Sequence, residues 1–349
     1  MNSISSIREE AFKLASSKTD ISKVMEDPTY EKYGSIYMAT TANVVDTMKL
    51  YKNCNDVLAI GGTGAHCYEA ILNGATTVDM FDVNELQKLY FEYMYTAIMH
   101  LDYETFIKHF TLANKTSFMH KSEIKDLLSE ELYNKLVKYL PKDVEFVFSP
   151  LYNYYDSFDL LTSNLFITDH PINLDYLKRN TSFYNEDEYY KLQKILRKEN
   201  CQIKYKTVSL TDVPSEFDKQ YDLIVLDNLL QYYKDIPELE TPYLTNLFIQ
   251  KKLSNLLKDE GAIQVNYGFG IAAEAFKEKF NIPSNFELPK DTLLSILPKS
   301  MILREEQKNG INIPLVEGYG DYSYDFITGV EIEDGANMDN LVLTYKKKR

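Results

Sequence analysis

The sequence predicts an α/β fold built on a doubly wound, mostly parallel sheet of seven strands. A short apolar run, 57–60, leads into a glycine cluster, Gly61-Gly-Thr-Gly64. Short apolar segments then alternate with segments of helical periodicity, and two of them end in an acid, Asp82 and Asp227. Alternation of this kind is typical of a parallel sheet, which binds its ligands at the carboxyl ends of the strands.

The first strand–turn–helix–strand unit spans residues 56–85. Residues 57–60 are wholly apolar, as expected of a buried strand, and 77–81 form the second strand. Gly74 stands where a glycine ends the intervening helix.

A helical insertion, about 86–200, is expected between the second and third strands. Apolar residues recur there every three or four positions, and a tyrosine-rich, less regular stretch covers 151–158. The expected helices cover 85–101, 103–110, 122–140 and 186–198.

The alternation resumes after the insertion. The expected strands are 203–210, 221–227, 262–267, 300–304 and 340–345. A helix is expected over 244–257, with a turn at Asp259-Glu-Gly261. Residues 1–55 are expected to form a mostly helical N-terminal segment or lid, and 56–349 the main domain.

Composition narrows the range of partners. The chain has 349 residues, of which 44% are hydrophobic and 26% charged, as in an ordinary globular protein. Its net charge of -14 argues against nucleic acid and against an anionic membrane surface. No run approaches the roughly 18 apolar residues of a membrane helix, and the first ten residues are polar. A cytoplasmic protein is expected.

Cysteine and histidine give no sign of a metal site. Cys54, Cys67 and Cys201 are odd in number and far apart, so buried thiols are expected. The five histidines include no pair with the i, i+4 spacing of a helical zinc site.

Three groups of residues follow expected strands and form a candidate ligand site. Glycines at 61, 62 and 64 let a backbone approach a ligand closely. Asp82, about 20 residues on, is placed as an acid that grips a ribose diol. The third group, Asp227-Asn228, follows the fourth strand, with Thr211-Asp212 after the third strand as its weaker companion. The fingerprint for NAD requires a further glycine or alanine where this chain has Cys67.

The order of these elements resembles class I S-adenosylmethionine-dependent methyltransferases, which have a Rossmann-like fold. The resemblance implies S-adenosyl-L-methionine as cofactor. It implies that Gly61, Gly62 and Gly64 pass under the methionine part, that Asp82 binds the ribose and that Asp212 meets the adenine. The remaining predicted cofactor contacts are Thr63, Val83, Asn84 and Thr211.

A narrower resemblance lies in residues 20–110. Asp82-Val-Asn84, a long helix and then Leu101-Asp-Tyr-Glu-Thr-Phe106 look like the S-adenosylmethionine:diacylglycerol 3-amino-3-carboxypropyl transferases of betaine-lipid synthesis. Val24-Met-Glu-Asp-Pro28 is similar to that family's Trp-Glu-Asp-Pro segment. Glu85 replaces the family's proline, and Met25 its tryptophan. The chain has no basic amphipathic helix for a membrane surface, so a small soluble acceptor is expected.

These observations predict a transferase that moves a methyl or 3-amino-3-carboxypropyl group. Such a displacement needs alignment and exclusion of water more than a covalent residue. Asp227, Asn228 and Tyr232 follow the fourth strand, where they could take a proton from the acceptor. A non-catalytic nucleoside-binding protein and an NAD-dependent oxidoreductase are the alternatives.

Two further segments, 37–43 and 317–326, can each be interpreted in two ways. Residues 37–43 form either a lid that brings Thr41 to the cofactor or a plain helix start with Thr41 as its cap. The glycine- and tyrosine-rich residues 317–326 form either a loop over the acceptor site or a surface loop.

Overall fold

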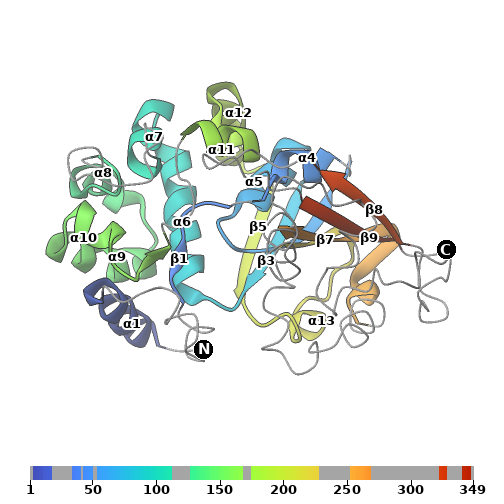
Figure 1. The fold of residues 1–349 in the computed structure, drawn as a ribbon, viewed down its shortest axis with the longest axis horizontal. Coiled ribbons are helices and arrows are strands. Elements are labelled where there is room, and N and C mark those ends of the chain that lie inside the picture. Colours follow the sequence, from blue (N-terminus) through green and yellow to red (C-terminus); the bar gives the residue numbers. More distant parts are fainter. Residues whose placement is uncertain are drawn as a thin grey trace, which may run out of the picture. The chain divides into compact units, whose positions relative to one another are not determined.

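The computed structural model describes residues 3–17, 34–40, 42–49, 53–111, 126–167, 174–227, 252–268, 322–327 and 340–346. Within them, seven strands form one sheet in the order β5-β3-β2-β6-β7-β9-β8 (Figure 1). The strands are β2 (Asp56–Ile60), β3 (Thr77–Asp82), β5 (Gln202–Thr207), β6 (Tyr221–Asp227), β7 (Leu257–Gly268), β8 (Tyr322–Ile327) and β9 (Asn340–Lys346).

The strand directions confirm the predicted α/β class. β2 pairs in parallel with β6, β6 with β7, and β3 with β5, whereas β9 runs antiparallel to both β7 and β8. The five strands before β8 therefore follow the 3-2-1-4-5 order of doubly wound sheets. The expected strand at 300–304 lies outside the described residues, and β8 was not predicted.

The chain divides into two compact units, residues 1–45 with 61–209 and residues 46–60 with 210–349. The first unit contains β3, β5 and most of the helices. They are α1 (Ile4–Ser16), α5 (Ala65–Leu72), α6 (Glu85–His100), α7 (Tyr103–Phe110), α8 (Glu130–Leu136), η1 (Val137–Tyr139), α9 (Lys142–Tyr154), α10 (Ser157–Leu161), α11 (Leu174–Asn180), η2 (Ser182–Tyr184) and α12 (Glu186–Arg197). α4 (Val44–Lys49) crosses the boundary between the units.

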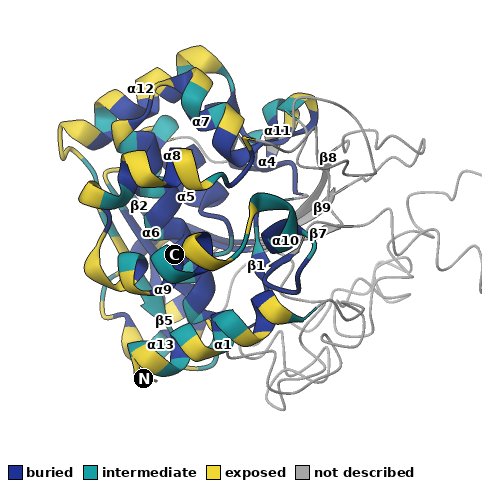
Figure 2. Cartoon of the chain, turned by 90° about the vertical axis from the view of Figure 1, so that its left-hand side faces the viewer, coloured by how far each residue is buried: buried dark blue, intermediate teal, exposed yellow. Residues whose placement is uncertain are grey.

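Helix α6 contacts four other helices of the first unit. It packs against α1, α8, α9 and α12 (Figure 1). α1 buries one face, through residues such as Ile7, Ala11 and Leu14, and exposes the other (Figure 2). Tyr93 of α6 lies at the centre of a buried aromatic cluster that also contains Tyr90, Phe110, Tyr133, Phe148 and Tyr152. Edge-to-face ring packing of this kind adds to the stabilisation from burial alone.

The N-terminal segment departs from the predicted mostly helical structure. Ile36–Tyr37 form a short strand, β1, parallel to β4 (Phe166–Ile167). A two-residue strand has no periodicity of its own, and its partner lies about 130 residues away in the sequence. Its formation depends on tertiary pairing.

Two helices of the insertion differ from expectation. α9 runs through Pro150 to Tyr154, so the predicted irregular stretch is helical over its first four residues. Its buried residues, Val144, Val147, Phe148, Leu151 and Tyr152, follow helical spacing. The helix predicted over 122–140 begins at Glu130 within the described residues, where Ser129 caps it by accepting the N–H of Leu132.

The second unit differs from expectation around β7. Residues Leu253–Leu256 form a short 3₁₀ helix, η5, and β7 starts at Leu257, so the helix predicted to reach 257 is wrong there. The turn predicted at 259–261 is a register shift inside β7, which pairs Tyr221 with Leu257 and Leu223 with Ala262. Glu260 has a positive φ at this bulge. The remaining element of the unit is α13 (Val213–Glu216).

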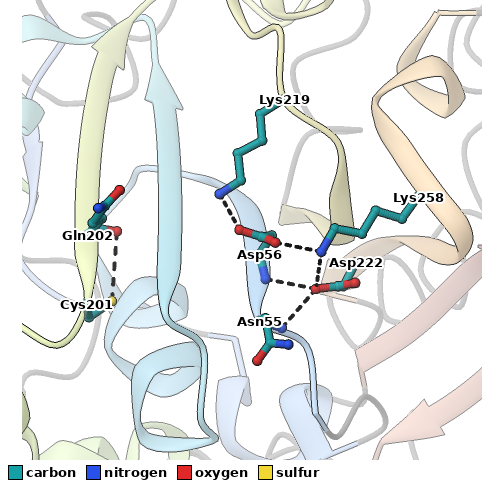
Figure 3. A network of polar contacts seen from close by, with 7 residues as sticks. All are labelled: Asn55, Asp56, Cys201, Gln202, Lys219, Asp222 and Lys258. Carbon is teal, nitrogen blue, oxygen red and sulfur yellow. Dashed lines mark hydrogen bonds and ion pairs between the residues drawn. The ribbon is translucent and has the colours of Figure 1, made fainter.

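A network of charged groups joins the amino ends of β2, β6 and β7 (Figure 3). One carboxylate oxygen of Asp222 accepts the backbone N–H groups of Asn55 and Asp56, both at 2.9 Å. Lys258 lies 3.0 Å from Asp222 and 2.6 Å from Asp56, and Lys219 also pairs with Asp56. Partial burial raises the pKa of Asp56, but the two ammonium groups outweigh it and lower the pKa below its usual value.

Replacing Asp222 by alanine is expected to lower the free energy of unfolding by about 1–2 kcal/mol, because two strand-end N–H groups lose their acceptor. Urea denaturation of the variant and of the parent measures the difference. Lys191→Ala is a control, because it removes an exposed pair with Glu188 that contributes at most about 1 kcal/mol. Equal losses from the two changes would contradict a special role for Asp222.

Candidate functional site

The glycine turn, Gly61–Gly64, follows β2 and leads into α5. The N–H of Gly61 donates to the carbonyl of Phe81 at 2.6 Å, and that of Gly64 donates to the carbonyl of Gly61 at 2.8 Å. Gly64 precedes the first residue of α5 with φ of 78°. This left-handed conformation favours glycine, so the sequence pattern has a local cause.

Asp82 at the end of β3 holds this turn in place. Its Oδ2 accepts the N–H of Gly62 at 2.9 Å, and its Oδ1 accepts the N–H of Asn84 at 3.0 Å. A carboxylate offers about four acceptor positions, and three backbone N–H groups approach this one, so roughly one position remains for a ligand. The side chain is half-buried. Burial raises its pKa, although the N–H groups of Asn84, Gly62 and Val83 act against the shift.

Asn84 and Gln87 attach the segment 34–37 to the start of α6. The side chain of Asn84 accepts N–H groups of Leu86 and Gln87 and donates to the carbonyls of Gly34 and Ser35. The side chain of Gln87 accepts the N–H of Tyr37 at 2.8 Å and donates to its carbonyl at 3.1 Å. The amide of Asn84 is therefore fully occupied as a helix cap and a tie, and its predicted contact with the cofactor stays a prediction.

Three aromatic rings surround the glycine turn, and the sequence interpretation missed all of them. A Cβ atom on Gly61 would lie 2.9 Å from Cε2 of Tyr205 and closer still to its hydroxyl. A Cβ atom on Gly64 would lie 2.7 Å from Cε2 of Phe91 and 3.3 Å from Cε2 of Tyr68. The signal for Tyr205 is its place in a predicted strand, but its reach to Gly61 depends on the sheet.

Val83 and Glu85, which closely follow Asp82 in the sequence, add an apolar and an acidic side chain near the turn. Val83 exposes 42% of its surface, which is unusual for valine at the end of a buried strand. One carboxylate oxygen of Glu85, in the first turn of α6, is buried and has no hydrogen-bond partner in the described part of the chain. Thr63 in the turn is nearly buried, and its hydroxyl accepts the N–H of Ala65.

The other predicted site residues belong to the second unit or lie outside the described residues. Thr211 and Asp212 precede α13, and the side chain of Asp212 is exposed. Asp227 ends β6 opposite Asn266 of β7. Ala59 of β2 pairs with Val225, so these strands end at the same edge.

Thr41, Asn228 and Tyr232 lie outside the described residues. Residues 322–326 were predicted as loop but belong to β8, while 317–321 lie outside.

Two features, a membrane-spanning helix and a cluster of metal ligands, are absent from the described part of the chain. No helix there is long and apolar enough to cross a membrane. No group of three or more His, Cys, Asp or Glu side chains there could hold a metal ion. Cys67 is buried as predicted, whereas Cys54 and Cys201 are half-buried.

Comparison with known proteins finds likeness at the level of structure alone. No protein-family model and no curated protein sequence matches this chain. N-methyltransferase NodS from Bradyrhizobium japonicum WM9, in complex with S-adenosyl-L-homocysteine, is 8% identical with a TM-score of 0.35, covering 98% of this chain and 99% of its own. The methyltransferase domain of bacterial CtHen1-C is 10% identical with a TM-score of 0.35, covering 88% and 95%.

A third similar structure is an O-methyltransferase family protein from Burkholderia thailandensis. It is 8% identical with a TM-score of 0.32, covering 87% of this chain and 55% of its own. All three are methyltransferases, but identities and TM-scores this low leave the functional proposal to the residues of the site.

Proposed function

We propose that this chain is an S-adenosylmethionine-dependent transferase that acts on a small soluble acceptor. The observation that carries the proposal is the geometry of Asp82. Its carboxylate fixes the glycine turn through Gly62 and still has an acceptor position for a hydroxyl of a ribose. The turn and the acid both follow strands of the parallel part of the sheet, where ligands of such folds bind.

The residues around Asp82 have distinct roles in this proposal. Gly61, Gly62 and Gly64 let the backbone approach the methionine part, and Thr63 shapes the turn. The exposed side chain of Val83 offers an apolar surface for the adenine. Thr211, Asp212 and Thr41 are proposed as further contacts of the cofactor.

The site favours a sulfonium nucleoside over NAD for two reasons. Cys67 occupies the fingerprint position that a glycine or alanine fills in NAD-binding turns, and it is buried. An acid at Asp82 would bind ribose in either ligand, but Glu85 adds a second acid, which suits a sulfonium cation better than a pyrophosphate because like charges repel.

S-adenosylmethionine supplies an electrophilic carbon next to its sulfonium, and the chain supplies alignment. The acceptor nitrogen or oxygen forms a bond to that carbon, the carbon–sulfur bond breaks, and its electron pair stays on sulfur. The acceptor's proton is proposed to go to Asp227, with Asn228 and Tyr232 orienting the acceptor. Transfer of a methyl group is the main form of the proposal. Transfer of the 3-amino-3-carboxypropyl group is the second.

Asp82→Ala is expected to weaken binding of S-adenosylhomocysteine by about 10- to 100-fold, since the loss of hydrogen bonds to a charged group costs roughly 1.5–3 kcal/mol. Isothermal titration calorimetry measures the affinity. Asp102→Asn is the matched control, because Asp102 also accepts a backbone N–H, from Thr105 at 2.8 Å, at the start of α7. An unchanged affinity in Asp82→Ala would contradict the proposed place of the ribose.

The mass of the product distinguishes the two forms of the reaction. Methyl transfer leaves S-adenosylhomocysteine, whereas transfer of the 3-amino-3-carboxypropyl group leaves methylthioadenosine. Binding without either product, across a panel of small amines, phenols and thiols, would favour the non-catalytic nucleoside-binding alternative.

A further inference from the structure

The hydroxyl of Tyr205 is buried against the glycine turn and has no hydrogen-bond partner among the described residues. Tyr205 lies in β5 opposite Met80 of β3, and its side chain reaches Gly61. The absence of a side chain at Gly61 is what makes room for the hydroxyl. A polar group thus lies at the first residue of the proposed binding turn.

Packing fixes the position of this hydroxyl. The ring of Tyr205 lies 5.5 Å from the ring of Phe91, which is itself stacked on Tyr68 at 5.6 Å. A tyrosine held in this way cannot turn its hydroxyl toward solvent without disturbing the two other rings. Burial raises the pKa of Tyr205 well above its usual value, and the negative charges of Asp82 and Glu92 raise it further. The hydroxyl therefore stays protonated and can donate a hydrogen bond at neutral pH.

An unmade hydrogen bond at a buried hydroxyl costs about 1–3 kcal/mol, and native proteins rarely leave one without a purpose. We propose that Tyr205 is a further binding residue, whose hydroxyl donates to a ribose oxygen of the bound nucleoside beside Asp82. This inference rests on the proposed function. Nothing lies within 4 Å of a Cβ atom placed on Gly62, so there is open space beside the turn.

Tyr205→Phe tests the inference, because it removes only the hydroxyl. Tyr90→Phe is the matched control. Among the described residues the hydroxyl of Tyr90 is also buried without a hydrogen-bond partner, but its ring packs against Phe110 and Phe166. For each variant, the melting temperature without ligand and the dissociation constant for S-adenosylhomocysteine are measured.

The two variants are expected to behave alike without ligand and differently with it. Neither should melt below the parent protein, because each loses a hydroxyl that forms no hydrogen bond within the part of the chain that the structure describes. Tyr205→Phe should bind S-adenosylhomocysteine about 3- to 10-fold more weakly, the range expected for one neutral hydrogen bond. Tyr90→Phe should bind it as the parent does.

Two results would overturn the inference while leaving the proposed function intact. The first is binding by the parent with equal affinity in Tyr205→Phe. The second is a clearly lower melting temperature of Tyr205→Phe without ligand, which would mean that the hydroxyl already has a partner in the protein. Failure of the parent protein itself to bind S-adenosylhomocysteine would overturn the proposed function, and this inference with it.

Discussion

Gly64→Ala is expected to lower the free energy of unfolding by about 2–4 kcal/mol, because it combines backbone strain with a steric clash. Gly64 has φ of 78°, in the left-handed region that costs other residues roughly 1–2 kcal/mol. The added Cβ atom would also meet the ring of Phe91. That ring is held between Tyr68 and Tyr205, so it cannot move aside freely.

Urea denaturation of Gly64→Ala and Gly62→Ala separates the two contributions. Gly62 also has a positive φ, of 41°, but a Cβ atom there meets nothing within 4 Å. Gly62→Ala should therefore show only the backbone strain, about 1–2 kcal/mol. If the two variants were equally stable, the tight packing of Phe91 on the turn would be ruled out.

The second large effect concerns pH. His109 is fully buried in the aromatic cluster, where its Nε2 bonds to the hydroxyl of Tyr93. Burial lowers the pKa of His109 to about 3, although a hydrogen bond to the backbone of Asp126 acts against the shift. The unfolded chain takes up this proton below pH of about 6.5, and the folded chain does not until about 3. Stability should therefore fall as the pH drops through this window.

The expected loss from His109 is about 1.4 kcal/mol for each pH unit below about 6.5, or roughly 2 kcal/mol at pH 5. Denaturation at pH 7, 6 and 5 measures it. His109→Gln should be less stable than the parent at pH 7 but should show a shallower decline toward pH 5. His100→Gln is the control, because His100 stacks on Tyr139 and is largely exposed. A decline that is unchanged in His109→Gln would contradict the assignment.

The strands around the site could be predicted because their signals are local. The runs 57–60, 77–81 and 221–227 are rich in apolar residues, and each appears as a strand within one residue of the predicted limits. The structure explains the glycine at 64 by a positive φ, and the role of Asp82 in binding a ligand stays a prediction.

The missed features depend on contacts between distant parts of the sequence. β1 forms because Ile36 pairs with Phe166. A strand of two residues is too short to show a periodicity in the sequence. Tyr205 was expected to be an ordinary strand residue; its contact with Gly61 follows from the packing of β5 beside β3. The sequence predicts a turn at 259–261, where the structure has a bulge with a positive φ at Glu260. Turns and bulges both accommodate a residue with positive φ, so the sequence pattern does not separate them.

The turn held by Asp82 is proposed to bind a sulfonium nucleoside. Calorimetric titration of the full chain with S-adenosylmethionine, and separately with NADH, tests it most directly. Micromolar binding of S-adenosylmethionine is expected, weakened by about 10- to 100-fold in Asp82→Ala, with no binding of NADH. Binding of NADH alone would contradict the account.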